Sequence, residues 1–301
     1  MTMIVFCGYA NNDVTVRVPR IPHTGERVQA TAVEQVDGGM NANAAVSAAR
    51  MGATVMFAGA VGADARSGEF LVGLEREGVD TSWAPRDAFL STAIVMVTPD
   101  GDRAIISQDD ANDAGRIAVV LRRVADSGGG WVYLDGYRAA FLPCVVDKRV
   151  ELMIDLDGCE DRTAALRAFA LAEHVVVGRG LWEGRFGIAP HAWPDLAAEH
   201  RTCLLVTDGA RGWTLVTPDR KVLDEPAVPV RVVDAIGAGD CFGGTYIAFV
   251  DAGHAPAEAA RLAGAAAALA CTTAGPRACP SLHELTRSTD SPTILEPQEI
   301  P

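Results

Sequence analysis

The chain has 301 residues, of which 49% are hydrophobic, enough for one large α/β domain or two smaller ones with a sizeable core. Its formal net charge of −13 argues against a polyanion such as DNA as partner, although a local positive site would still suit a small anion. No apolar run reaches the length of a membrane span, and no basic region precedes the apolar start of the chain. The seven scattered cysteines lack metal-ligand or CxxC spacing, which favours reduced thiols. These features predict a cytoplasmic protein without nucleic-acid or membrane partners.

Several common catalytic signatures are missing. Lys148 and Lys221 are the only lysines and neither follows a glycine, so there is no phosphate-binding loop of the GxxxxGK[ST] kind. GxGxxG, GxSxG and HExxH are also absent, which removes the usual signatures of dinucleotide-dependent oxidation, serine hydrolysis and zinc proteolysis. A nucleotide site in this chain must therefore use another architecture.

The N-terminal segment predicts a buried parallel strand over 3–7. Asn11, Asn12 and Asp13 follow at its carboxyl end, which is where ligands collect in open α/β sheets. An Asx-rich turn would leave the same pattern, so both interpretations stand at this point.

Two segments, 14–36 and 92–107, show loose alternation broken by turn residues, which predicts antiparallel strands rather than helix. They fit poorly into an otherwise alternating β/α chain, so we expect them to form a small separate sheet. Short exposed strands need cover for their edges and their apolar face. A second subunit is expected to provide it, which predicts a homodimer through this sheet.

The remainder alternates between strand-length and helix-length segments, which predicts a doubly wound, mostly parallel sheet. Gly38 and Gly39 precede an alanine-rich helix that ends at Gly52, with Asn43 in its first turn. From Thr286 the chain is polar, contains prolines and is expected to fray. The other expected strands are 54–59, 131–134, 152–156, 175–177 and 203–206, the other expected helices are 67–77, 116–126 and 257–271, and a hairpin is expected at 213–217 and 221–223.

The most informative stretch is DAIGAGDCFGGTYIAFV at 234–250. The β-branched run at 230–233 predicts a strand, the glycines of 237–239 a tight turn, and Asp240 the start of a helix. Such an arrangement points backbone N–H groups and a helix N-terminus at one spot, which attracts phosphate. Because a carboxylate does not help to bind an anion, Asp240 suggests a base that accepts a proton while the backbone holds a phosphoryl group. A plain turn with an aspartate cap is the alternative.

Four segments, in order, resemble the ribokinase-like (PfkB) carbohydrate kinases. They are GYANND at 8–13, the stretch 38–81 that opens with GGMNANAAVSAARMG, TDGARGW at 207–213 and DAIGAGD at 234–240. The resemblance covers nearly the whole chain. It implies a ribokinase-like fold with a small β-sheet lid over the sugar site, and a kinase that transfers the γ-phosphoryl group of ATP to a hydroxymethyl group of a sugar or sugar-like substrate.

The resemblance also assigns roles to individual residues. It implies ATP and Mg²⁺ as cofactors and K⁺ as a further ion. The residues that match are Asp240 as catalytic base, with Gly237, Ala238 and Gly239 as anion hole; Asn11, Asp13, Gly39 and Asn43 around the substrate; Thr207, Gly209 and Gly212 at the nucleotide; and Asp234 with the loop 272–279 at a monovalent cation.

The magnesium site departs from the family pattern. Members of the family commonly carry an NxxE motif that organises magnesium and phosphate, but residues 178–181 read GRGL, and Glu183 lies two residues late. Asp155 and Asp157, at the end of a strand, either approach the metal or form a solvated turn. Met40 and Asn41 stand where ribokinases proper tend to have lysine and glycine.

Arg138 is a further substrate-binding candidate. It follows the strand 131–134 at the carboxyl edge of the sheet, and its planar fork suits a carboxylate, phosphate or sulfonate. Family members that act on acidic sugars look similar in placing a cation on this side. Alternatively, Arg138 starts a helix and reaches solvent or a surface acidic residue.

Two other functions remain open on the same scaffold. A nucleoside kinase would differ in the lid and the acceptor pocket, and a sugar- or nucleotide-sensing protein would lack catalysis. The presence of Asp240 at the glycine turn favours an enzyme, because a sensor has no need of a base.

Overall fold

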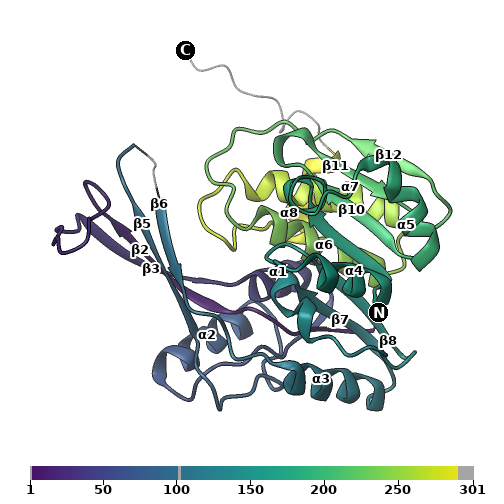
Figure 1. Cartoon of the computed structure of the whole chain (residues 1–301), viewed down its shortest axis with the longest axis horizontal. Coiled ribbons are helices and arrows are strands. Elements are labelled where there is room, and N and C mark those ends of the chain that lie inside the picture. The colour runs from purple at the N-terminus through teal and green to yellow at the C-terminus, as the bar shows by residue number, and fades with distance from the viewer. Residues whose placement is uncertain (1, 101–102, 291–301) are drawn as a thin grey trace.

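The computed structural model describes residues 2–100 and 103–290, which form a large and a small β-sheet (Figure 1). The large sheet has the strand order β12-β11-β10-β9-β8-β7-β1-β4. Six neighbouring strands of this sheet, β4, β1, β7, β8, β9 and β10, are parallel, and β11 and β12 add an antiparallel hairpin at one edge. The predictions of a mostly parallel sheet and of a late hairpin are therefore confirmed. The strands are β1 (Met3–Phe6), β4 (Thr54–Phe57), β7 (Gly130–Asp135), β8 (Val150–Asp155), β9 (His174–Gly178), β10 (Cys203–Thr207), β11 (Trp213–Val216) and β12 (Val222–Glu225).

Helices cover both faces of the large sheet. Ile4 and Phe6 of β1 pack into one hydrophobic cluster and Val5 into another, because successive side chains of a strand point to opposite faces. The cluster of Ile4 and Phe6 includes residues of α1, α2, α6 and α7, and the other includes residues of α3, α4 and α5. The bounds are α1 (Met40–Arg50), α2 (Ala65–Arg76), α3 (Ala114–Asp126), α4 (Arg162–Leu171), α5 (Trp193–His200), α6 (Ala238–Asp251), α7 (Pro256–Ala270) and α8 (Leu282–Asp290), with short turns η1 (Gly136–Phe141), η2 (Gly180–Arg185), η3 (Pro190–Ala192) and η4 (Gly209–Arg211).

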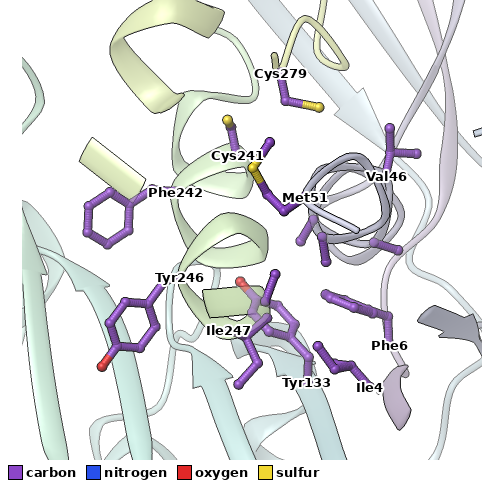
Figure 2. Packing of buried hydrophobic residues seen from close by; sticks show 14 of the residues in the cluster. Ile4, Phe6, Val46, Met51, Tyr133, Cys241, Phe242, Tyr246, Ile247 and Cys279 are labelled. Atoms are coloured by element: carbon purple, nitrogen blue, oxygen red, sulfur yellow. The ribbon is translucent and has the colours of Figure 1, made fainter. Parts of the chain in front are cut away.

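Close packing of α6 against α1 and the sheet positions the functional residues. Figure 2 shows Cys241 of α6 above Tyr133 and next to Met51, which follows α1, with Tyr246 on the other side of α6. Glycines permit this approach, since a Cβ atom at Gly243 would clash with the Tyr133 hydroxyl and one at Gly244 with the carbonyl group of Ala44. The N-termini of the two helices are thereby held side by side.

The small sheet projects from the body as a lid, in the order β3-β2-β5-β6 (Figure 1). The predicted segments hold most of its four strands, and the pairs β2–β3 and β5–β6 are antiparallel as expected, but β2 and β5 pair in parallel, so the prediction of antiparallel strands is wrong for the centre of this sheet. β2 also starts at Asn11, so Asn11, Asn12 and Asp13 form the root of a lid strand rather than an Asx-rich turn. The strands are β2 (Asn11–Arg17), β3 (Ala32–Gly38), β5 (Ser91–Val97) and β6 (Arg103–Ser107).

Two sequence predictions about local structure are wrong or incomplete. Residues 230–233 form no strand: Val232 and Val233 are 61% and 60% exposed, and no neighbouring strand reaches them. Thr286 does not begin a frayed tail, because α8 continues to Asp290, and the prolines beyond it lie outside the described residues. Within 2–100 and 103–290, no helix is both long and apolar enough to cross a bilayer.

Candidate active site

Asp240 lies in the first turn of α6, after the glycine turn that the sequence singled out. Gly237 adopts φ 78°, and a Cβ atom there would clash with the carbonyl group of Pro276, so this position requires glycine. The N–H group of Ala238 bonds to the carbonyl oxygen of Ala235 at 3.3 Å. The next N–H groups, of Gly239 and Asp240, lie where a helix has no carbonyl groups of its own to bond. This turn can therefore hold an anion beside the Asp240 carboxylate.

The surroundings of Asp240 suit a proton acceptor. Burial, together with the negative charges of Asp157, Asp135 and Asp13, raises its pKa to about 7, although a hydrogen bond from Asn43 acts in the opposite direction. That hydrogen bond runs from Nδ2 of Asn43, in the first turn of α1, to Oδ2 of Asp240 over 2.8 Å. A carboxylate with a pKa near neutrality accepts a proton more readily than an ordinary aspartate.

Asn11 and Asp13 lie together at the root of the lid. Nδ2 of Asn11 donates to Oδ1 of Asp13 over 2.7 Å, while Oδ1 of Asn11 is buried without a partner among the described residues. Gly38 leaves room for both side chains, and Gly39, at φ 102°, brings the start of α1 against the backbone of Ala10. The structure thus joins two predicted substrate segments that are far apart in the sequence.

Asp135, at the end of β7, is a polar residue of this region that the sequence analysis missed. Its buried Oδ2 accepts hydrogen bonds from Nδ2 of Asn41 at 3.0 Å and from the N–H group of Tyr9 at 2.5 Å. Burial raises its pKa to about 6. Its place at the carboxyl end of a parallel strand is the signal that could have identified it.

Arg138 is buried, with 1% of its surface exposed, and its guanidinium faces the chain's own acidic residues. Nη2 contacts Asp109 at 2.6 Å, Nη1 contacts Asp110 at 3.0 Å, and Nε lies 3.8 Å from Asp135. The predicted cationic fork therefore already has internal carboxylate partners, and its role in binding an acidic sugar stays a prediction. The alternative is confirmed in part: Arg138 lies in the short helix η1 and pairs with the exposed Asp109, but its own side chain does not reach solvent.

Asp155 and Asp157 lie deeper than a solvated turn would place them. Asp155 is buried and its pKa lies well above the ordinary value, through burial and the neighbouring charge of Asp157. Oδ1 of Asp157 accepts a hydrogen bond from the N–H group of Gly178 at 2.8 Å. Across 2–100 and 103–290, however, no group of three or more acidic, histidine or cysteine side chains is arranged to hold a metal ion.

The predicted nucleotide segment follows β10. Thr207 ends this strand, and Gly212 takes φ 103° at a point where a Cβ atom would clash with the carbonyl group of Glu225. Gly209, also at positive φ, has open space around it. These glycines allow a sharp turn at the strand end, where a nucleotide could approach the backbone.

Ion pairs engage the charged side chains of the segment that stands in place of the NxxE motif. Nη1 of Arg179 contacts Glu183 at 3.0 Å, and Nε contacts Asp208 at 2.8 Å. Arg211 also bonds to Asp208 and lowers its pKa. Glu183 therefore does not present a free carboxylate to a magnesium ion.

Asp234 ties the glycine turn to the loop 272–279. Its Oδ1 accepts from the N–H group of Ile236 and its Oδ2 from that of Gly275, each at 3.0 Å. The two segments that the sequence analysis assigned to a monovalent cation are thus adjacent in the fold.

Comparisons with known proteins agree with this geometry. The family model described as pfkB family carbohydrate kinase matches residues 1–124 and 189–283. A ribokinase of Bacillus subtilis is 25% identical over 300 residues, which cover 91% of this chain and 94% of that protein. An ATP-dependent ribose-1-phosphate kinase of Halopiger xanaduensis is 26% identical over 274 residues, covering 82% and 84%. The structure of Arabidopsis thaliana ribokinase complexed with ribose and ATP superposes with a TM-score of 0.81 at 23% identity, covering 95% of this chain and 97% of that one.

Proposed function

The chain belongs to the pfkB family of carbohydrate kinases, which are ATP-dependent phosphotransferases, and we propose that it phosphorylates a hydroxymethyl group of a neutral sugar with Asp240 as general base. The observation that carries this proposal is the Asp240 carboxylate, which accepts a hydrogen bond from Asn43 at the N-terminus of α6, beside a glycine turn able to hold a phosphoryl group. The proposed residue roles extend those that the family resemblance implied.

In the proposed reaction, Asp240 removes the proton from the acceptor hydroxyl as its oxygen attacks the γ-phosphorus atom of ATP. The oxygen–phosphorus bond to the acceptor forms, the bond to the β-phosphate oxygen breaks, and ADP leaves. The N–H groups of the 237–239 turn stabilise the charge on the transferred group, so positioning and electrostatics carry most of the catalysis. Asn11, Asp13, Gly39 and Asn43 would orient the sugar, and Thr207, Gly209 and Gly212 would line the nucleotide.

Mg²⁺ is expected to enter with ATP. Magnesium commonly takes most of its ligands from substrate phosphates and water, with one or two protein carboxylates. This mode fits a chain whose described residues form no metal-binding group of their own. Among the acidic side chains whose charge raises the pKa of Asp240, Asp157 has the largest effect, which makes it a candidate to assist in holding the ion.

The charge of the site favours a neutral acceptor. Asp13, Asp135 and Asp157 all act electrostatically on Asp240, and Arg138 is neutralised by internal partners. Carboxylates accept hydrogen bonds from sugar hydroxyls and repel a phosphate or carboxylate group. The ribose bound in the Arabidopsis thaliana structure is an uncharged sugar of this kind.

A screen of ADP release distinguishes the candidate acceptors. Pentoses and ketohexoses should be turned over, with much lower kcat/KM for acidic sugars, sugar phosphates and nucleosides. A sugar phosphate or a nucleoside as the best substrate would contradict the neutral-sugar proposal. Ligand binding without ADP release from any acceptor would instead support a sensor.

We also propose that the lid forms a homodimer through its outer face. In the strand register, the side chains of one face are apolar apart from Gln35 and the residues at the base of the sheet. The other face mixes Asp13, Thr15 and Glu34 with the apolar Val36, Val95 and Ile105. Val33 and Ile106 of the apolar face are 59% and 62% exposed. A second copy would bury this surface while leaving Asp13 free to face the substrate. The apolar face comprises Val14, Val16, Val33, Ile94, Met96 and Ile106.

Two neighbouring isoleucines provide a matched test of this interface. Ile106 and Ile105 are exposed to a similar extent, 62% and 57%, but lie on opposite faces. By light scattering at micromolar concentration, the wild type and Ile105→Glu should be dimers and Ile106→Glu a monomer. A monomeric wild type, or dimers of both variants, would contradict the proposed face.

A further inference from the structure

Arg277 lies in the loop between α7 and α8, and its side chain reaches back to the proposed base through one intermediary. Its Nε donates to Oδ1 of Asn43 over 3.1 Å, and Nδ2 of Asn43 donates to Oδ2 of Asp240 over 2.8 Å. The guanidinium also lies 3.6 Å from a carboxylate oxygen of Asp37 and 5.0 Å from the ring centroid of Phe70. These contacts hold Arg277 in one place, with little of its side chain exposed to solvent.

The chemistry of the two neighbours fixes which way the Asn43 amide points. A guanidinium has only donors, so it can be paired with the amide oxygen and not with the amide nitrogen. With Oδ1 turned toward Arg277, Nδ2 faces Asp240. An amide N–H that donates to a carboxyl group favours its ionised form, whereas the oxygen of a flipped amide would accept a hydrogen bond from the protonated form and favour that form.

We propose that Arg277 is a positioning residue that locks the Asn43 amide in the orientation that donates to Asp240, and so keeps the base ready to accept a proton. This inference rests on the proposed role of Asp240. Arg277 acts through Asn43, since its own contacts are with Asn43, Asp37 and Phe70.

The other groups around Asp240 make this hydrogen bond important. The charges of Asp13 from β2, Asp135 from β7 and Asp157 after β8 all raise the pKa of Asp240. The charge of Asp240 in turn raises the pKa values of Asp155 and the buried Tyr133. Tyr137 of η1 is affected in the same way. Among the described residues, the Asn43 amide is the side chain that donates a hydrogen bond to the Asp240 carboxylate. Loss of its fixed orientation should therefore favour protonated Asp240.

The test is the pH profile of kcat/KM for Arg277→Met, with the acceptor found in the screen. We expect its acidic limb to move up by about one pH unit, the scale of one charge-assisted hydrogen bond, which gives about tenfold lower activity at pH 6 and little change at pH 9. Arg277→Lys, which keeps a donor-only side chain, should show a smaller shift than Arg277→Met. Arg76→Met is the matched control, because Arg76 is an exposed arginine that lines the same 910 Å³ cavity as Arg277.

A double variant separates positioning from general structural damage. If Arg277 acts through Asn43, Arg277→Met should cause no further pH shift in an Asn43→Ala background. An unshifted profile in Arg277→Met, or an equal shift in the two backgrounds, would overturn the inference. If Arg277→Met does not fold, Arg277→Gln takes its place, because a glutamine amide can accept as well as donate and no longer fixes Asn43.

A measurement without turnover keeps this inference distinct from the proposed function. The Asp240 carboxyl group can be titrated by NMR in protein labelled at aspartate carboxyl carbons, with its signal assigned from Asp240→Asn. Arg277→Met should raise the observed pKa by about one unit, and an unchanged pKa would refute the positioning role. If Asp240→Asn retained full kinase activity, the proposed base would fail whatever Arg277 does to this titration.

Discussion

Two segments at the carboxyl edge of the large sheet carry an acidic side chain after a glycine, and they differ in the partner of that side chain. In the 234–240 segment, Asp240 meets a neutral amide, and burial raises its pKa to about 7. In the 178–185 segment, Glu183 contacts the guanidinium of Arg179. The Glu183 carboxylate is thus engaged by a positively charged side chain, whereas the Asp240 carboxylate is not part of an ion pair. The comparison indicates that the neighbour, rather than the residue type, selects the base.

The largest expected effect separates these two carboxylates directly. Asp240→Asn should bind ATP but lose about a hundred- to ten-thousand-fold in kcat, because the general base is removed. Glu183→Gln, the matched change in the other segment, should stay within a few-fold of the wild type. Steady-state kinetics with ATP titration measure both. Near-normal turnover in Asp240→Asn would remove it from the mechanism, and an equal loss in Glu183→Gln would give Glu183 a catalytic or magnesium-binding role.

The pH dependence sharpens the same contrast. Because Asp240 must be ionised to accept a proton and its pKa is raised to about 7, kcat/KM should fall about tenfold per pH unit below that value. An ordinary aspartate would keep the enzyme active down to about pH 4. Initial rates from pH 5 to 9 test this, with protein stability checked at each pH. A flat profile between pH 5 and 7 would be inconsistent with Asp240 as a base of raised pKa.

The glycines of the two segments should also respond differently. Gly237→Ala places a Cβ atom against the carbonyl group of Pro276 at positive φ, and should cost about 1–3 kcal/mol of unfolding free energy together with activity. Gly180→Ala has open space around it and should change stability by less than about 0.5 kcal/mol. Denaturant unfolding of both variants measures the difference. Equal stabilities would show that the 237 turn relaxes without strain.

The smallest expected effect concerns potassium. Asp234 joins the glycine turn to the loop 272–279, so an ion bound there would stabilise the turn without contacting the reacting atoms. Rates in tris buffer should rise with added potassium chloride, and Asp234→Ala should abolish the rise. Choline chloride at equal ionic strength is the control. Identical rates with both salts would contradict the cation site.

Much of the site was predictable because its signals are local. The turn at 237–239 needs glycine for its backbone conformation, and a run of apolar and small residues predicts the helix that follows it. The mostly parallel sheet follows from alternating strand-length and helix-length segments. The family resemblance added the roles of Asn43 and Asp13, which the isolated patterns could not assign.

Local patterns were therefore enough to predict most elements of the large sheet, the approximate lid strands and the position of Asp240, since each depends on residues close together in the chain. Only the tertiary structure decided the partners of the charged groups. Arg138 is neutralised by acidic residues from another segment, and Arg277 contacts Asn43 across 234 positions of sequence. The run at 230–233 is as β-branched as a strand, yet no neighbouring strand pairs with it. Ion pairs and strand pairing depend on groups that folding brings together from distant segments, and no local pattern records them.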